Sequence, residues 1–277
     1  MQMRNYKPII AGAAVCWFGL FAAVHAAPMK LGEALVVNVP DLKADADVEA
    51  FEAYVLGQLA PAWKRSAPGM ELHLVRKDRG NHEGRYLLAY TTDTLARRQG
   101  YASKLSEDSP FRAELLAKVG EAVTGLDRFL NRAGQYIEYH LVGPEAIASL
   151  PAVEILGIHY AKVRPDQRQA LDQFLTDKLH PAVGNLRPDL GLLYYKPVRG
   201  TAAENYLAIF ALTVASRDKY WPGGSDSAEL EAAFGPVQPL ATELSTYLVE
   251  GSYATGNLAA AVYESREWAD WVQVRAE

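Results

Sequence analysis

The chain has 277 residues, of which 49% are hydrophobic and 22% are charged, and its formal net charge is −5 at pH 7. This length and apolar content are sufficient for two packed domains, and the acidic balance without a basic cluster excludes nucleic acid as the expected partner. The only cysteine is Cys16. A chain that lacks the first 26 residues therefore has no disulfide, no cysteine nucleophile and no thiolate ligand for a metal.

Residues 1–26 predict a secretory signal peptide. Arg4 and Lys7 form a short basic region, and residues 9–24 carry no charge. That apolar run is short for a membrane span, which needs about 20 residues, and small residues precede the expected cleavage before Ala27. We therefore expect a periplasmic or secreted protein without membrane association after cleavage. An uncleaved anchor is the alternative.

Residues 33–142 predict one βαββαβ unit. Hydrophobic residues recur at helical spacing from Val48 to Leu59, and Pro61 together with Ala67-Pro68-Gly69 is expected to end that helix. Apolar runs bounded by turn residues predict the strands, and a long apolar periodicity predicts the second helix. The expected strands cover residues 34–39, 72–76, 85–91 and 135–142, and the second helix covers residues 111–126.

Residues 153–265 predict a second unit with the same order of elements. A helix is expected to begin at Pro165, and Gly235-Pro236 is expected to kink the last helix. The expected strands cover residues 153–163, 192–196, 205–212 and 258–264. Residues 266–277, with Trp268, Trp271 and Val272, are expected to form an apolar C-terminal tail.

The two units also repeat in sequence. A shift of 120 residues places residues 59–101 on residues 179–221 without a gap, and ten of these 43 pairs are identical. The identical pairs include Arg79 with Arg199, Gly80 with Gly200 and Arg97 with Arg217. The repeat predicts a tandem duplication of an α+β, ferredoxin-like domain, with the open sheet faces of the two copies packed together as a pseudo-dimeric α/β barrel.

Three sequence segments carry a resemblance to a known family. They are Tyr86-Leu87-Leu88-Ala89-Tyr90 as a third strand, Ser109-Pro110-Phe111 at a helix start, and Asp218-Lys219-Tyr220-Trp221. With the element order, they make the chain similar to the dimeric α/β-barrel superfamily, which includes antibiotic-biosynthesis monooxygenase-like and NIPSNAP-like proteins. The resemblance implies a small apolar or aromatic ligand and a cofactor-free monooxygenase, lyase or isomerase activity. Haem-binding relatives imply a histidine axial ligand, with His140, His159 and His180 as candidates.

The expected strand at residues 135–142 carries the candidate catalytic pair. Strand alternation groups Ile137, Tyr139 and Leu141 on one apolar face, which is expected to meet the helices. The other face, with Tyr136, Glu138 and His140, is then expected to point into the barrel. A glutamate and a histidine two residues apart on one strand face can form an acid–base pair. A solvated pair at the rim is the alternative.

Further candidates stand beside this pair. His73, on an otherwise apolar strand, is a third catalytic candidate, and its alternative is a satisfied core residue. The resemblance implies a substrate contact for Asn38, and His159 lies on the first strand of the second unit. Tyr101 and Trp221 occupy matching positions and either line a pocket or pack between helix and sheet.

The chain lacks a nucleophile elbow, a phosphate loop, a dinucleotide fingerprint and a zinc-protease motif. We therefore expect no metal and no cofactor, with haem as the lesser alternative. A non-catalytic binding or assembly module stays open beside the enzyme, as does a homodimer.

Overall fold

The computed structural model describes residues 28–81, 84–104, 110–132, 134, 136–150, 153–184, 189–200, 205–224, 226–249 and 268–275. The expected signal peptide and the expected strand at residues 258–264 lie outside the described residues. We refer to residues 28–150 as the first half and to residues 153–275 as the second half. Within the described part of the chain, no helix combines the length and apolar character that a membrane span requires.

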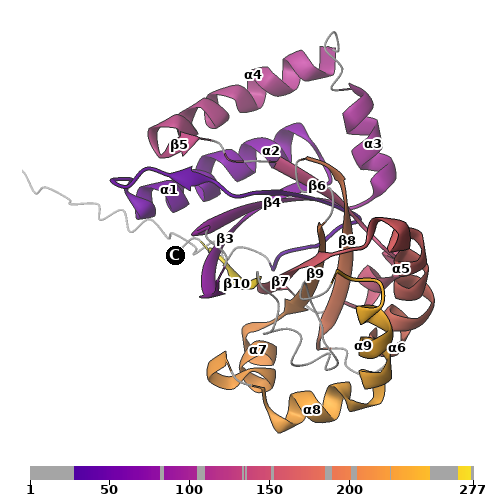
Figure 1. Ribbon diagram of the computed structural model, residues 1–277. Helices are drawn as coiled ribbons and strands as arrows, with labels where there is room; N and C mark the ends of the chain where they lie inside the picture. Colours follow the sequence, from indigo (N-terminus) through magenta and orange to yellow (C-terminus); the bar gives the residue numbers. More distant parts are fainter. Residues whose placement is uncertain are drawn as a thin grey trace, which may run out of the picture.

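Eight strands form one closed barrel in which every neighbouring pair is antiparallel (Figure 1). A separate two-stranded ribbon pairs β2 with β5. The strands are β1 (Ala34–Asn38), β2 (Asp41–Leu42), β3 (Met70–Gly80), β4 (Tyr86–Thr92), β5 (Leu130–Arg132), β6 (Tyr136–Leu141), β7 (Ile155–Lys162), β8 (Gly191–Arg199), β9 (Asn205–Leu212) and β10 (Trp268–Gln273).

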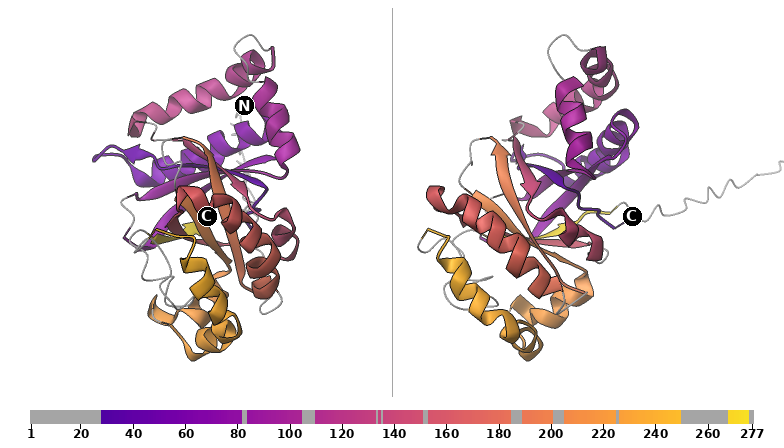
Figure 2. Two further views of the ribbon diagram at one scale, coloured as in Figure 1. Left: turned by 45° about the vertical axis from the view of Figure 1, so that its right-hand side comes forward. Right: turned by 90° about the vertical axis from the view of Figure 1, so that its right-hand side faces the viewer.

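Helices lie on the two outer sides of the barrel (Figure 2). The first half has α1 (Val48–Tyr54), α2 (Ala60–Ser66), α3 (Leu95–Lys104) and α4 (Pro110–Thr124). The second half has α5 (Arg168–Phe174), α6 (His180–Gly184), α7 (Val214–Tyr220), α8 (Ala228–Phe234) and α9 (Gln238–Ser245). Short 3₁₀ turns are η2 (Gly125–Arg128), η3 (Pro144–Ser149), η4 (Pro165–Gln167), η6 (Pro222–Gly224) and η7 (Gly235–Val237).

The strand order around the barrel is β1-β4-β3-β10-β7-β9-β8-β6. Each half contributes four neighbouring strands, and in both halves the fourth strand of the unit lies beside the first, followed by the third and the second. This is the order of a ferredoxin-like sheet. The halves join at two seams, where β3 pairs with β10 and β6 pairs with β8. The mixed α+β class and the closed barrel agree with the expectation from the sequence.

The barrel lumen is a packed core. Side chains from both halves meet there and are almost completely buried, among them Leu35, Tyr139, Leu193, Tyr195 and Trp271. The Tyr195 hydroxyl donates a hydrogen bond of 2.7 Å to the Gly32 carbonyl. Eight-stranded barrels are narrow enough for side chains to fill them. The lumen therefore stabilises the fold, and a ligand site is expected on the outer faces.

A helix-covered core lies on each outer face. In the first half, Phe51 and Leu59 pack on Leu72 and Tyr86. In the second half, the core extends to α8 and α9, because Phe234 and Leu244 join Phe210 and the other outward residues of the sheet. Burying these apolar faces stabilises the fold by roughly 25 cal/mol for each Å² removed from water.

Strand β10 corrects the expectation of a C-terminal tail. Trp268, Trp271 and Val272 belong to the strand that closes the barrel, between β3 and β7. Ala269 and Trp271 point into the lumen core, whereas Val272 packs on the second-half core. The large apolar Trp271 side chain needs burial, and the gap between the two sheets provides it.

Pro61 does not end its helix. The chain passes through a π-helical turn, η1 (Val55–Leu59), and continues as α2. The second half repeats this feature with η5 (Leu175–Leu179) before Pro181. Proline has no N–H to donate and clashes with the preceding turn, so a widened turn lets the helix continue. The 3₁₀ turn η7 at Gly235-Pro236 confirms the expected kink.

The halves also share a polar network. In each half, one helix carboxylate accepts hydrogen bonds from a cation on the second strand and a tyrosine hydroxyl on the third. The first network joins Glu52 with Arg76 at 3.2 Å and with Tyr86; the second joins Asp172 with Lys196 at 2.6 Å and with Tyr206 at 2.9 Å. These residues correspond at the same shift of 120 positions.

Candidate functional site

The orientation of β6 is opposite to the one expected. Tyr139 and Leu141 belong to the lumen core, whereas Glu138 and His140 face the helix layer of the first half. The physical reason is that packed, largely apolar side chains fill the lumen, whereas Arg98 lies on the outer face and can pair with Glu138. The apolar face of β6 therefore turns inward, and the polar face turns towards α3.

Glu138 and His140 form the expected pair, and Arg98 of α3 joins them. Arg98 donates two hydrogen bonds to the Glu138 carboxylate, from Nε at 3.0 Å and from Nη2 at 2.7 Å. His140 Nε2 lies 3.1 Å from Glu138 Oε1. Glu138 is buried, and burial alone would raise its pKa, but the hydrogen bonds and charges of Arg98 and His140 lower the pKa below its usual value.

This geometry determines which nitrogen of His140 carries a proton. An ionised carboxylate can only accept, so Nε2 must donate to Glu138. The neutral ring then has its lone pair on Nδ1, for which no hydrogen bond to a described residue is found. His140 retains 20% side-chain exposure. The arrangement is that of a general base held in one tautomer by a carboxylate, which Arg98 in turn holds in place.

Aromatic side chains extend from this polar group. The Tyr136 ring, two residues before Glu138, lies 6.1 Å from the Tyr90 ring, and Tyr90 lies 5.4 Å from Trp63 of α2 in an edge-to-face arrangement. Asn38 pairs with Tyr136 in the β1–β6 register and is buried. The Trp63 indole nitrogen is buried and has no hydrogen-bond acceptor among the described residues. The outer face of β1 and β6 therefore offers aromatic surface and a free donor.

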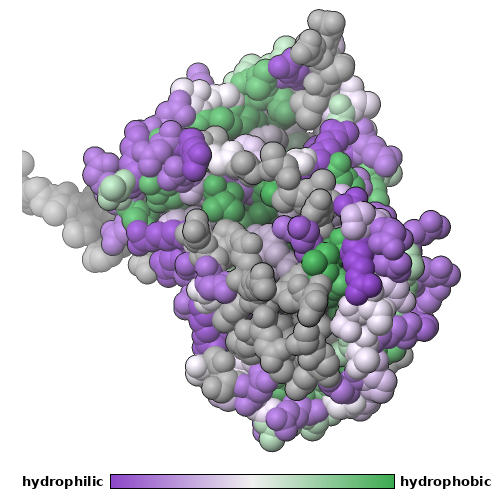
Figure 3. Space-filling model, viewed as in Figure 1, coloured by the Kyte–Doolittle hydropathy of each residue, from purple (hydrophilic) through white to green (hydrophobic). Residues whose placement is uncertain are grey.

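The two helices over this face are held differently. Helix α3 has no buried residue. Helix α4 packs against α2 and η1, and its Leu116 and Val123 are 57% and 43% exposed. Tyr136 below them is 48% exposed. Figure 3 shows apolar residues along this helix layer and in the recess beneath it. We use the name first-half cleft for the region of this outer face that carries Trp63, Tyr90, Tyr136, Glu138 and His140, which ring contacts and hydrogen bonds connect as described above.

The remaining predicted residues lie elsewhere. His73 is on β3, and its Nε2 lies 3.5 Å from Oε2 of Glu71. Its position in the strand alternation points it into the lumen, on the opposite face of the barrel wall from Glu138. Burial lowers the His73 pKa to about 4. His159 lies on the outer face of β7, as Asn38 lies on the outer face of β1, and not in the lumen. It is fully buried against Phe210. Tyr101 anchors α3 by donating to the Pro68 carbonyl at 2.7 Å.

The second half has a carboxyl at the position that corresponds to Glu138. Asp270 pairs with Arg79 across one seam, as Glu138 pairs with Arg199 across the other, and a register shift follows both carboxyl residues. Burial raises the Asp270 pKa to about 6, although the charges of Arg217 and Arg79 act in the opposite direction. Trp221, a predicted ligand contact, packs edge-to-face on Phe210 in the core. The second-half position is thus closed by packed side chains.

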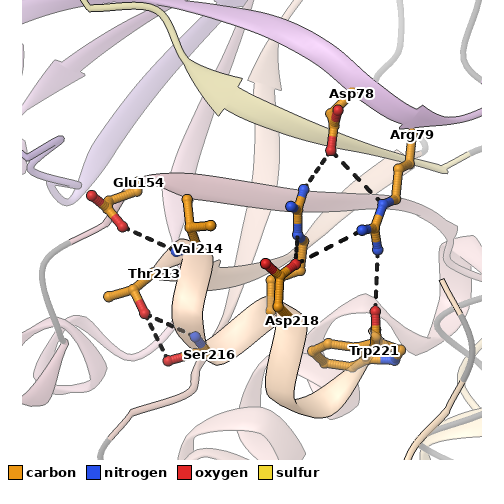
Figure 4. Close-up of polar contacts among 9 residues, drawn as sticks. Asp78, Arg79, Glu154, Thr213, Val214, Ser216, Asp218 and Trp221 are labelled. Carbon is orange, nitrogen blue, oxygen red and sulfur yellow. Dashed lines mark hydrogen bonds and ion pairs between the residues drawn. The ribbon is translucent and has the colours of Figure 1, made fainter. Parts of the chain in front are cut away.

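Ion pairs hold the seam beside Asp270 together (Figure 4). Arg217 of α7 donates to Asp78 of β3 and, at 3.1 Å, to Asp218. Arg79 lies 3.8 Å from Asp218 and donates to the Trp221 carbonyl at 3.2 Å. Arg217, the arginine that both halves retain, therefore has a structural role here.

No family model matches the chain, and no curated protein matches it. Among solved structures, the chain is similar to a monooxygenase candidate from Fusobacterium nucleatum, with 6% identity, a TM-score of 0.48, and coverage of 90% of this chain and 94% of the other. A dye-decolorizing peroxidase from Bacteroides thetaiotaomicron gives 10% identity, a TM-score of 0.43, and coverage of 90% and 95%. A variant chlorite dismutase from Candidatus Nitrospira defluvii gives 8% identity, a TM-score of 0.42, and coverage of 90% of this chain and 94% of the other. These low identities and TM-scores support no inference about activity. The fold follows from the strand order of this chain.

Two of the three histidine candidates for a haem ligand are enclosed by packed side chains. His159 packs against Phe210 inside the second-half core, whereas the bond of His140 to Glu138 uses Nε2 and leaves Nδ1 without a described partner. His180 has no partner at either ring nitrogen, but its Nδ1 lies against Gly143, where an added Cβ atom would be 3.0 Å away. Its ring packs on Tyr194. The described residues also contain no group of three acidic, histidine or cysteine side chains able to hold a metal ion.

Sequence reasoning missed Arg98 and Trp63. Arg98 follows Arg97, which both halves retain and which bonds Asp93 four residues earlier at 2.5 Å. The available signal was the difference between the halves. Arg98 and Trp63 correspond to Asp218 and Val183, so both are features of the first half alone.

Proposed function

We propose that the first-half cleft binds a small, largely apolar or aromatic molecule and that His140 removes a proton from it. The observation that carries this proposal is the chain Arg98–Glu138–His140, which leaves His140 Nδ1 as a base on the same face of β6 as the exposed Tyr136 ring, which lies four residues earlier on the strand. The reaction class is abstraction of a proton from a weakly acidic C–H or O–H group. An electron-rich anion of this kind can react with dioxygen, which is the monooxygenase-like form of the proposal.

Each group in the cleft has one role. Tyr136 and Trp63 supply aromatic surface for the bound ring, and the Trp63 N–H supplies a donor to an oxygen of the ligand. Glu138 keeps His140 in the required tautomer and stabilises its protonated form. Arg98 keeps Glu138 ionised, so Arg98 and Glu138 are positioning residues and His140 is the catalytic residue.

A coloured phenol tests this function. para-Nitrophenol should bind the protein at about pH 6, where the free phenol is mostly neutral, and bound probe should show the absorption of the phenolate. We expect His140→Gln to retain binding and lose the phenolate band, and Tyr136→Ala to weaken binding by roughly tenfold, since a buried aromatic contact is worth about 1 kcal/mol or more.

The same experiment separates the two kinds of function. Binding with a neutral spectrum in the wild type and in His140→Gln would leave a binding module without base chemistry. No binding at all would reject the cleft as the site. The matched control is Tyr247→Phe, which removes a hydroxyl that contacts Glu243 of α9 in the second half and should change neither result.

The finer architecture and the location are also proposals. We propose that the two halves arose by tandem duplication, because the sheet order, the π-helical turns and the Glu52 and Asp172 networks recur at one shift. We further propose that residues 1–26 direct export. Mass spectrometry of the protein from its host should find a chain that begins near Ala27, and a full-length chain in the cytoplasm would contradict export.

A further inference from the structure

The two seams of the barrel place an arginine at corresponding positions. Arg79 ends β3 opposite Asp270, and Arg199 ends β8 opposite Glu138. Each is followed by a glycine with positive φ, +107° at Gly80 and +112° at Gly200, which only glycine adopts readily. The backbone around the two arginines is therefore the same, and differences in what they contact arise from neighbouring side chains.

The positive charge of Arg79 is fully used within the protein. Its guanidinium lies 3.8 Å from both Asp78 and Asp218 and donates to the Trp221 carbonyl at 3.2 Å. Figure 4 shows these groups converging from β3 and α7. This arginine joins the halves and has no capacity left for a ligand.

Arg199 has lost both of these anionic partners. At the shift of 120 residues, Val198 takes the place of Asp78 and Arg98 takes the place of Asp218. Arg199 is exposed, and its side chain makes no hydrogen bond or ion pair with a described residue. Glu138 opposite it is already held by Arg98 and His140. The guanidinium of Arg199 therefore keeps its hydrogen-bond donors for another partner.

The position of Arg199 brings this charge to the ligand. The β8 and β9 pair rises from the second half beside β6 and towards the helix layer of the first half (Figures 1 and 2). The register pairs Arg199 with Glu138, so both side chains leave the same face of the sheet. The second half thus contributes Arg199 to the rim of the first-half cleft.

We propose that Arg199 is an anion-binding residue of this cleft and that the natural ligand carries a carboxylate or a similar anionic group beside its apolar ring. The proposal rests on the proposed function, because it uses the same cleft. A guanidinium can bind a carboxylate through two parallel hydrogen bonds, which fixes the orientation of the ring relative to His140. Arg98 cannot serve in this way because Glu138 occupies it.

A pair of probes with the same ring tests the proposal. Naphthoate carries the anion, and naphthalenemethanol carries a neutral hydroxyl in its place. We expect the wild type to bind naphthoate roughly tenfold more tightly than the alcohol, the equivalent of one charge-assisted hydrogen-bond pair. Arg199→Gln should remove this preference without changing the affinity for the alcohol, and Arg199→Lys should retain part of it. Isothermal titration calorimetry measures both affinities.

Arg132→Gln is the matched control. It removes one exposed arginine, bonded to Asp41 on the separate ribbon, and changes the net charge equally. It should leave the preference intact. Equal affinities of Arg199→Gln and wild type for naphthoate would overturn the anion site, and if both probes still depended on Tyr136, the proposed function would stand. Failure of both probes to bind would overturn the two proposals together.

Discussion

At the scale of single residues, the same carboxyl position has opposite chemistry in the two halves. Glu138 has a lowered pKa because Arg98 and His140 donate to it, despite burial that acts the other way. Asp270 has a raised pKa, about 6, because burial outweighs the nearby arginines, which are engaged with other acids. Direct hydrogen bonds from a cation, and not proximity to one, make the difference.

The first prediction concerns the buried ion pair. Glu138→Gln leaves Arg98, whose side chain is only 14% exposed, without its counterion. We expect a loss of about 3 kcal/mol in the free energy of unfolding, measured by urea denaturation at about pH 7. The double variant Arg98→Met, Glu138→Leu should recover most of this loss because no charge stays buried. A loss below about 0.5 kcal/mol would show that the pair behaves as an exposed one.

At the scale of elements, α3 is the weakly held part of the site. It presents Arg98 to the cleft without burying any residue of its own. Its attachments are polar, namely the Tyr101 bond to Pro68 and the Glu33 carboxylate that accepts from the Leu95 amide at 2.7 Å. Elements with few apolar contacts open at low free energy. Movement of α3 is therefore expected to control access to the cleft.

The second prediction tests the stability of α3. Gly100 lies within the helix, and an added Cβ atom would have no neighbour within 4 Å. Gly100→Ala should stabilise the protein by about 0.5–1 kcal/mol and slow amide hydrogen exchange across α3, because alanine favours the helix. The control is Gly32→Ala, whose Cβ would lie 2.0 Å from the Thr92 carbonyl oxygen. That change should destabilise by about 2 kcal/mol or more. Unchanged exchange in Gly100→Ala would contradict the idea.

Local patterns predicted most elements well, and their failures have clear causes. The expected strand at residues 205–212 is β9, and the kink at Gly235-Pro236 is η7. The tail at residues 266–277 was wrong because a strand that pairs on both edges with distant segments shows no local sign of its partners. The inward face of β6 was wrong because alternation separates two faces but does not say which one meets the barrel lumen.

At the scale of the whole molecule, one chain closes a barrel that needs two sheets. Both seams join segments from different halves, and β10 at the C-terminus completes one of them. Closure leaves no free strand edge in the barrel, which protects the protein from edge-to-edge association. As a consequence, β3 and β7 both depend on β10 as their second pairing partner.

The third prediction removes that strand. A chain that ends at residue 267 exposes one edge of β3 and one edge of β7 and loses Trp271 from the lumen core. We expect it to lose cooperative unfolding and to aggregate. The point variant Trp271→Ala keeps the strand and should cost about 3–5 kcal/mol. Cooperative thermal unfolding of the truncated chain at the wild-type midpoint would show that β10 does not close the barrel.

The fourth prediction is acid sensitivity. Burial lowers the pKa of His73 and His180 to about 4 and that of His159 to about 3. The unfolded chain titrates near 6.5, so these residues contribute full stability above that pH and lose it as the pH falls. Asp270 acts in the opposite direction, because its raised pKa lets the folded state take up a proton between about pH 4 and 6.

Near pH 5, the unfolded chain therefore binds roughly two more protons than the folded protein. The free energy of unfolding should then fall by about 3 kcal/mol for each unit that the pH is lowered. Urea denaturation between about pH 7.5 and 5 measures this slope. His180→Phe should reduce the slope by about one proton and should raise stability at about pH 7, because two unpartnered buried nitrogens are removed. A slope close to zero in the wild type would contradict the buried, neutral state of these histidines.

The sequence by itself determined the repeated βαββαβ order and the presence of a Glu138–His140 pair, because hydrophobic periodicity and spacing along one strand are local properties. Only the tertiary structure decided the packing of the lumen, the orientation of β6 and the role of β10. It also brought Arg98 and Arg199 to the pair from 40 and 61 residues away along the chain. Which face is buried, and which charge is left unpaired, depend on contacts between distant segments, and no local pattern records them.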